Sequence, residues 1–179
     1  MKKIVVNDTN VFIDLLDVGL LDDFFRLPWE IHTTDFVMWE LLREGQRDAV
    51  NEFENNGLLH VASFDFEELQ KIDKLYKRFN TKTNVSLTDC SVWYYAKQNN
   101  YILLTGDRKL RSSATNEGVE VRGIMYVFDE LVDTGAISFV VASEKLAMLK
   151  KINPRLPKDE IDKRLKMWNG EQNKKGGGL

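Results

Sequence analysis

Residues 4–10 decide the fold; they read Ile-Val-Val-Asn-Asp-Thr-Asn, an apolar run that ends in four polar residues. A short apolar run closed by turn-forming residues is typical of a buried strand. A second such run, Tyr101 to Thr105, is followed by Gly106 and Asp107. Helical patterns separate the runs, and strands that alternate with helices predict βαβ units and a mostly parallel sheet.

Five strands are predicted, at about residues 3–7, 30–34, 58–63, 101–105 and 119–122. Helices are predicted from residue 10, over 19–27, 35–43, 46–55, 63–79 and 86–98, after residue 107, and near 125–134, 143–151 and 157–168. The predicted fold class is α/β, a three-layer sandwich whose central parallel sheet, in the order 3-2-1-4-5, is flanked by helices. The first and fourth strands are then neighbours. Ligands bind beyond the carboxyl ends of such strands, where Asp8 and Asp107 stand.

Length and composition bound the class of protein. The 179 residues suffice for one domain with a core, and 43% apolar with 30% charged residues is ordinary for a globular protein. No apolar run approaches the roughly 20 residues of a membrane span, and Asp8 comes too early for a signal peptide. The lone Cys90 excludes an intramolecular disulfide, and two histidines make a zinc site improbable. We expect a cytoplasmic protein without a membrane partner.

The net charge of −3 hides an asymmetry: residues 1–68 carry a net −10 and residues 69–179 a net +7. Bases gather over residues 71–82, 108–111 and 145–166. Two interpretations are open. The bases are either solvated helix faces or a rim that grips a phosphate backbone beside an acidic centre.

Four carboxylates, those of Asp8, Glu40, Asp89 and Asp107, are the candidate catalytic and metal-binding residues. The predicted topology brings them toward one end of the sheet. Clustered carboxylates repel one another, and a hard divalent cation such as Mg²⁺ or Mn²⁺, which takes oxygen ligands, would hold them together.

Asp8 and Glu40 each have a structural interpretation as well. Asp8 is suited to cap the following helix, although Asn10 could cap it alone. Glu40 is the only polar residue in an apolar stretch of seven, so its helix is expected to be buried nearly all round. A buried Glu40 requires a metal or an ion pair, for which Arg43 or Arg47 is the candidate.

The other two acids also lie at helix starts. Asp89 closes the pattern Ser86-x-x-Asp89, which is that of a capping box. Asp107 follows Gly106, which lets the chain turn sharply, and Asp107 is suited to cap the next helix. A carboxylate in a first helical turn can still point past the helix end, so capping does not exclude metal binding.

These pieces together resemble the PIN domain: Asp-Thr-Asn after the first strand, a Glu in an apolar helix, Ser-x-x-Asp opening a later helix, and Leu-Leu-Thr-Gly-Asp after the fourth strand. PIN domains are nucleases, and many bacterial members are the VapC-like toxins of toxin–antitoxin pairs. The resemblance covers about residues 3–135, with Asn10 and Thr105 matching the polar residues that support the acidic quartet. Asp14 and Asp35 match no motif role and are expected to be surface or capping residues.

The resemblance implies a metal-dependent endoribonuclease that hydrolyses RNA phosphodiester bonds with one or two Mg²⁺ or Mn²⁺ ions bound by the quartet. RNA, an antitoxin protein and a second copy of the chain are the expected partners. We predict a PIN-like nuclease domain over residues 1–135, a helical extension over 136–169 and a disordered tail over 170–179, where apolar residues are almost absent.

Other functions fit less well. An aspartyl-phosphate phosphatase of the haloacid-dehalogenase type needs an acid where Asn10 stands, and no G-x-G-x-x-G follows the first strand for a dinucleotide. Cys90 has no histidine partner and is expected to be a buried small hydrophobe. The alternative kept open is a catalytically silent PIN fold that binds nucleic acid or protein.

Overall fold

The computed structural model describes residues 2–41 and 45–176, with side chains through Gly170. The chain divides into two compact units. The first unit is Met1–Ile13 with Pro28–Gly123, and the second is Asp14–Leu27 with Ile124–Leu179. The first unit contains the whole sheet and all four candidate acids.

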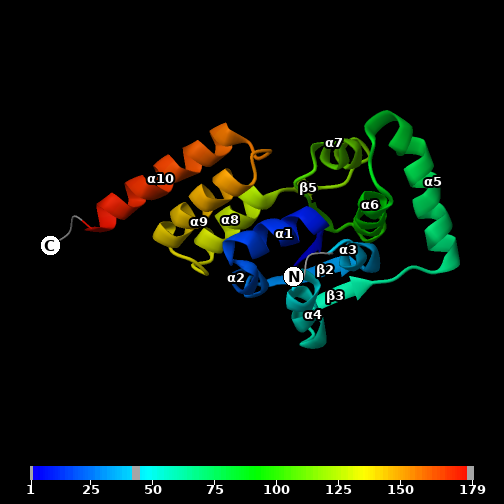
Figure 1. Ribbon diagram of the computed structural model, residues 1–179, viewed down its shortest axis with the longest axis horizontal. Helices are drawn as coiled ribbons and strands as arrows, with labels where there is room; N and C mark the ends of the chain where they lie inside the picture. Colours follow the sequence, from blue (N-terminus) through cyan, green and yellow to red (C-terminus); the bar gives the residue numbers. More distant parts are fainter. Residues whose placement is uncertain (1, 42–44, 177–179) are drawn as a thin grey trace. The chain divides into compact units, whose positions relative to one another are not determined.

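The sheet has five parallel strands in the order β3-β2-β1-β4-β5, which confirms the predicted order (Figure 1). The strands are β1 Lys3–Asn7, β2 Trp29–Thr34, β3 Leu59–Ala62, β4 Ile102–Leu104 and β5 Val121–Arg122. In the register of the two central strands, Asn7 lies beside Leu104. Asp8 N–H then donates to the Leu104 carbonyl at 3.0 Å, so both strands end at the same edge of the sheet. This shared edge brings the turns after β1 and β4 together.

The helices of the first unit are α1 Thr9–Val18, which continues into the second unit, α3 Asp35–Glu40, α4 Gln46–Asn55, α5 Phe66–Thr83, α6 Leu87–Asn99 and α7 Arg108–Asn116. α6 contacts three strands on one side and is covered by α5 on the other. A core cluster of Ile72, Val85, Cys90 and Tyr94 joins α5 and α6, and Cys90 is fully buried as predicted. Seven residues of α6 are buried, Thr88 and Ser91 among them, so the helix is covered around most of its circumference.

Two expected boundaries in this unit differ from the structure. The helix predicted over residues 35–43 ends at Glu40, and Leu41 already leaves the helical conformation. Arg43 lies outside the described residues. α5 extends beyond the predicted residue 79 to Thr83. It ends there because Asn84 takes the left-handed conformation at φ 56°.

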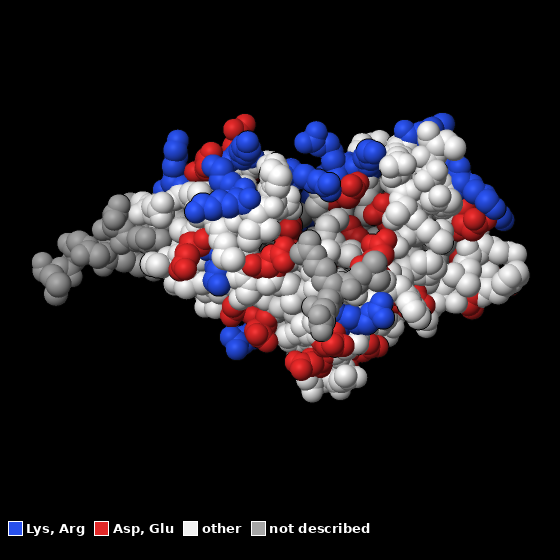
Figure 2. Space-filling model, in the orientation of Figure 1, with Lys and Arg blue, Asp and Glu red and all other residues white. Residues whose placement is uncertain are grey.

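Lys and Arg side chains gather over α5 and α7 (Figure 2). Several of the neighbouring cations are paired with acids. Lys77 bonds to Asp73 at 2.6 Å, while Arg78 and Lys97 share Glu117 at 3.0 and 2.9 Å. For these cations the interpretation as solvated, ion-paired helix faces applies.

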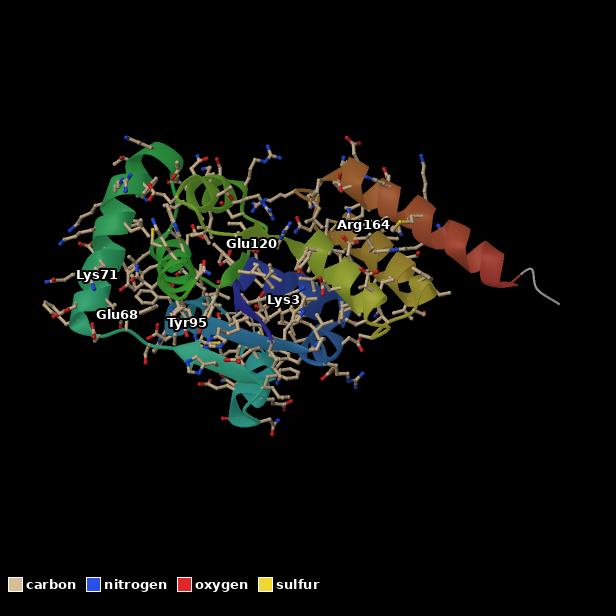
Figure 3. All side chains as sticks on the ribbon, turned by 180° about the vertical axis from the view of Figure 1, so that it is seen from behind. Lys3, Glu68, Lys71, Tyr95, Glu120 and Arg164 are labelled. Carbon is tan, nitrogen blue, oxygen red and sulfur yellow. The ribbon has the colours of Figure 1, made fainter. Side chains whose placement is uncertain are left out.

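The second unit is helical. It comprises the end of α1, α2 Leu21–Phe25, α8 Ile124–Asp133, α9 Phe139–Ile152 and α10 Lys158–Gly176. Trp168 is buried and stacks on Phe128 with ring centroids 6.4 Å apart. Arg164, labelled in Figure 3, holds Asp129 through two bonds of 2.7 and 2.6 Å. These contacts fix α10 against α8.

Asp14 corrects one expectation from the sequence, because it is a buried residue of the second unit and not a surface residue. Its Oδ1 accepts a bond of 2.9 Å from the Asn153 amide. Burial raises the pKa of Asp14 to about 6, although the bond from Asn153 opposes the shift. Asp35 is the first residue of α3 and accepts from the next N–H, that of Phe36, at 2.8 Å, while Thr34 occupies the N-cap position without a side-chain cap bond.

α10 also differs from expectation, because it continues through Gly170, where the tail is predicted to begin, as far as Gly176. The Glu, Gln and Lys residues of this stretch are good helix formers, and a single glycine inside a helix costs only about 1 kcal/mol. Residues 177–179 lie outside the described part of the chain. Over the described ranges, no helix combines the length and apolarity that a membrane crossing requires.

Candidate active site at the carboxyl edge of the sheet

Asp8 is the centre of the candidate site. It follows β1, and only 2% of it is exposed. Its Oδ1 accepts from Thr9 N–H at 2.8 Å. Its Oδ2 accepts from the Asn10 amide and from the Thr105 hydroxyl, each at 2.7 Å. Donors from the turns after both central strands thus fix the Asp8 carboxylate in one orientation.

Asn10 and Thr105 connect the two turns through their side chains. Asn10 donates to Asp8 and accepts from Gly106 N–H at 2.7 Å. Thr105 donates to Asp8 and accepts from Asp107 N–H at 3.0 Å. Because Asn10 bonds to Asp8 and Gly106, its side chain does not cap α1. A Cβ at position 106 would lie 3.2 Å from Asn10 Oδ1, so glycine keeps this turn tight.

Glu40 differs most from expectation, because it is exposed at the end of α3, next to Trp39, which is 71% exposed. The apolar stretch around it is therefore not buried all round: α3 is only six residues long and buries Val37 and Met38. The Glu40 carboxylate accepts from the Thr9 hydroxyl at 2.7 Å. Thr9 is thus the link between Glu40 and the Asp8 turn.

Arg47, a predicted ion-pair candidate for Glu40, serves a different purpose. Its guanidinium donates to the carbonyls of Met38 and Trp39 at 2.9 and 3.2 Å, and it lies 5.3 Å from the centre of the Trp39 ring. Within the described ranges Glu40 forms no ion pair with lysine or arginine. Its charge is therefore not neutralised by the residues that the structure describes.

Asp89 and Asp107 both cap helices, and the structural interpretations drawn for them from the sequence are correct. Ser86 and Asp89 form the reciprocal capping box of α6, with bonds of 2.6 and 2.9 Å. Asp107 Oδ1 accepts from Lys109 N–H and Leu110 N–H, each at 2.8 Å, at the start of α7. These caps use Oδ2 of Asp89 and Oδ1 of Asp107, so each carboxylate keeps a second oxygen for another ligand.

The electrostatics show that the acids influence one another. Burial raises the pKa of Asp8 to about 7, and the charge of Asp89 adds to the shift, against the bonds from Thr105 and Thr9. Burial also raises the pKa of Asp89, and the charges of Asp107 and Glu40 act in the same direction. Burial and the neighbouring negative charges therefore both disfavour the deprotonated forms of Asp8 and Asp89.

The donor chemistry of the site suits a hard cation, since carboxylate oxygens are what Mg²⁺ and Mn²⁺ prefer, and each oxygen that accepts one bond retains a second lone pair. The arrangement is nevertheless that of four separately hydrogen-bonded carboxylates. Across residues 2–41 and 45–170, no group of three or more Asp, Glu, His or Cys side chains is placed to hold a metal ion.

Two features escape sequence reasoning. No motif assigns a role to Thr9, yet its hydroxyl donates to Glu40, a partner 31 positions away that no local pattern identifies. Asn7 is fully buried, and neither polar atom of its side chain has a hydrogen-bond partner in the described structure. The position of Asn7 at the end of β1 does not predict that its side chain lacks hydrogen-bond partners.

The parallel sheet, its flanking helices and the acidic side chains at its carboxyl edge define an α/β protein whose candidate site lies at the ends of the strands. A family model described as a PIN domain matches residues 4–170, so the chain belongs to the PIN-domain family. The match extends beyond the sheet through α8 and α9 and most of α10. Among curated proteins, none matches the chain.

Solved structures resemble the chain in fold. PAE2754 from Pyrobaculum aerophilum has a TM-score of 0.50 at 14% identity, over 74% of this chain and 99% of that one. VapBC2 from Rickettsia felis, bound to a DNA fragment from their promoter, has a TM-score of 0.46 at 12% identity, over 67% and 98%. FitAcB from Neisseria gonorrhoeae has a TM-score of 0.40 at 16% identity, over 65% and 95%.

Proposed function

We propose that the chain is a metal-dependent endoribonuclease that hydrolyses RNA phosphodiester bonds. Asp8, Glu40, Asp89 and Asp107 are its catalytic residues and bind Mg²⁺ or Mn²⁺. The observation that carries this proposal is the buried Asp8 carboxylate, fixed by three donors at the sheet edge and electrostatically coupled to Asp89 and Glu40. Without an opposing charge, such an arrangement is costly.

Neighbouring residues orient the four candidate catalytic carboxylates. Asn10 and Thr105 orient Asp8 and tie it to the turn that carries Asp107. Thr9 orients Glu40, and Ser86 orients Asp89. A bound divalent cation would shield the phosphodiester charge and lower the pKa of an attacking water. Asp8, Glu40, Asp89 and Asp107 would hold the cation through their carboxylate oxygens.

The test is cleavage of structured and unstructured RNA by the purified chain in Mg²⁺, in Mn²⁺ and in chelator. Asp8→Asn is compared with Asp48→Asn, which changes an exposed acid on α4. We expect cleavage that requires metal, survives in Asp48→Asn and falls at least about a thousandfold in Asp8→Asn. Cleavage that persists in chelator or in Asp8→Asn contradicts the proposal. RNA binding without any cleavage by the parent chain would favour the silent binding module instead.

The partners follow from the same proposal. VapC-like toxins belong to the PIN-domain family, and we infer that an antitoxin protein binds this chain, that the chain forms a homodimer and that it acts in the cytoplasm. Co-purification with the product of a neighbouring small reading frame tests the antitoxin. Light scattering of the isolated chain tests the dimer, and a monomer mass at micromolar concentration would contradict it.

A further inference from the structure

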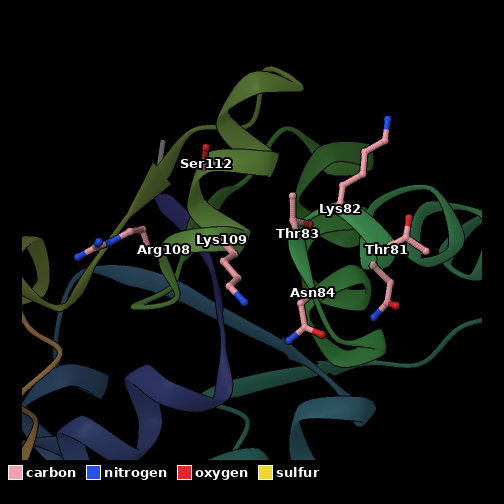
Figure 4. A pocket seen from close by; sticks show the side chains of 8 residues that line it. Thr81, Lys82, Thr83, Asn84, Arg108, Lys109 and Ser112 are labelled. Atoms are coloured by element: carbon pink, nitrogen blue, oxygen red, sulfur yellow. The ribbon is translucent and has the colours of Figure 1, made fainter.

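A basic groove lies between the end of α5 and the start of α7 (Figure 4). Its volume is about 640 Å³. The three cations that line it are Lys82 from α5 and Arg108 and Lys109 from α7; in Figure 4 the Lys109 side chain lies between the two helices, while those of Lys82 and Arg108 extend outward on either side. Asn84, Ser112 and Thr83 add amide and hydroxyl groups. No acidic or apolar side chain lies among the described residues of its lining, so the groove offers only positive charge and polar groups.

The three groove cations have no acidic partner among the described side chains, as is also true of Lys71 and Lys74 earlier on α5, whereas Lys77 and Arg78 do. Lys82, Arg108 and Lys109 are exposed, and none forms an ion pair with a side chain of the described ranges. Lys77 and Arg78, on the same helix as Lys82, are both paired with acids. Such pairing is what a solvated helix face shows. The groove cations therefore fit the other interpretation of the basic runs, a surface for an anionic ligand.

Not every base of this segment faces the groove. Arg111, one turn after Arg108, donates to the Thr105 carbonyl at 3.0 Å and is half-buried. It belongs to the support of the β4 turn. Arg108 and Lys109 are thus the two cations of α7 that remain available to a ligand.

Both walls of the groove lead directly to the acidic site. Arg108 and Lys109 follow Asp107, and Lys109 N–H donates to its carboxylate at 2.8 Å. On the other wall, Asn84 stands two residues before Ser86, whose N–H donates to Asp89. This wall is firm, because Asn80 holds the Val85 carbonyl at 3.1 Å and Val85 is buried in the core cluster. A chain whose reacting phosphate lies at the acids would have its next phosphates beside these cations.

We propose that this groove binds the phosphodiester backbone of the RNA substrate next to the bond that is cut, with Lys82, Arg108 and Lys109 contacting its phosphates; this inference rests on the proposed ribonuclease function. Lys, Arg, Asn, Ser and Thr are the side chains that usually contact phosphates. Among the described residues of its lining, the groove has no aromatic side chain on which bases would stack, so it contacts the backbone and is indifferent to sequence. It also lacks the apolar anchors of a protein interface, which favours RNA over an acidic polypeptide.

The test is a triple variant, Lys82→Gln with Arg108→Gln and Lys109→Gln. Its control, Lys2→Gln with Lys71→Gln and Lys74→Gln, removes the same charge from exposed positions outside the groove. Affinity for labelled oligo(U) and oligo(A) is measured by fluorescence anisotropy in chelator over a series of salt concentrations. Thermal melting of both variants confirms that they are folded.

We expect the groove variant to bind both RNAs at least about tenfold more weakly than the parent, with a slope of log affinity against log salt shallower by about 2, from roughly 0.7 per lost phosphate contact. The control should bind within about twofold. Equal losses of affinity in both variants would show that the effect comes from net charge alone, which would overturn the proposal. A loss for oligo(U) alone would overturn the backbone mode.

Cleavage in Mn²⁺ is measured on the same proteins, so that the two proposals fail separately. If the parent cleaves RNA and the groove variant still binds RNA normally, the groove proposal is wrong and the ribonuclease stands. If the groove variant loses RNA binding while no protein cleaves, the groove stands and the ribonuclease is wrong. If the groove variant loses affinity for poly(glutamate) but not for RNA, the groove binds acidic polypeptide and the proposal is overturned.

Discussion

At the scale of single residues, Asp8 is where folding and function conflict. The residue is buried, its pKa is raised to about 7, and its carboxylate still accepts bonds from Thr9, Asn10 and Thr105. A group whose folded pKa lies above its unfolded value of 3.8 contributes most stability when it is protonated. That contribution is lost as the pH rises through the folded pKa.

Asp8→Asn is therefore expected to change the pH dependence of stability. Between pH 4 and pH 7 the parent should lose free energy of unfolding relative to the variant by up to about 4 kcal/mol, from three pKa units at about 1.4 kcal/mol each. Urea titrations in chelator at several pH values measure it. Burial lowers the pKa of His32, which works in the opposite direction, but His32 is common to both proteins and cancels in the difference. A difference that does not change with pH would contradict the charge conflict at Asp8.

Thr9 gives a second prediction at this scale. If Thr9 acts through Glu40, Thr9→Val and Glu40→Gln should lower cleavage, and the double variant should be little worse than Glu40→Gln alone. Thr9→Ser keeps the hydroxyl and should restore most of the activity. The loss of stability in Thr9→Val should be about 1 kcal/mol. Strictly multiplicative losses in kcat/KM would show that Thr9 does not act by positioning Glu40.

At the scale of elements, β1 and β4 are predictable from the sequence because each is an apolar run closed by turn residues, and the strand order is predictable because strands that alternate with helices favour the doubly wound arrangement. The capping boxes are predictable for a similar reason, since Ser86 and Asp89 bond within one helical turn. Glu40 is not predictable in this way. Its exposure depends on where α3 ends, and its partner Thr9 comes from another part of the chain. Local sequence patterns predict hydrogen bonds within one helical turn. Hydrogen bonds between distant parts of the chain, such as the one from Thr9 to Glu40, can be predicted only once the fold is known.

The two capping boxes provide a matched pair for an element-scale prediction. Ser86→Ala at α6 and Asp65→Ala at α5 each remove a cap and should each cost about 1 kcal/mol of stability. The Ser86 hydroxyl accepts from the backbone N–H of the candidate catalytic Asp89 and so fixes the main chain at that residue, whereas Asp65 accepts from the backbone N–H of Glu68, which has no role in the site. We expect cleavage to fall severalfold in Ser86→Ala alone, at equal stability loss. Equal activity in the two variants would mean that the Asp89 cap has no part in catalysis.

At the scale of the whole molecule, the net charge of −3 conceals a first unit that carries both the acids and the basic groove. The acids favour a cation and the groove favours an anion, and a phosphodiester with its metal ion satisfies both. The second unit lies within the span of the family match to residue 170 and is fixed internally by Arg164 and Trp168.

The most direct measurement for the central claim is Mn²⁺ binding to the full chain by electron paramagnetic resonance, with Asp8→Asn and Asp48→Asn beside the parent. We predict saturable binding by the parent and by Asp48→Asn, weakened at least about tenfold in Asp8→Asn because the buried carboxylate at the centre of the site is lost. Mn²⁺ binding by the parent that is no tighter than binding by Asp8→Asn would contradict a metal site built on these four acids.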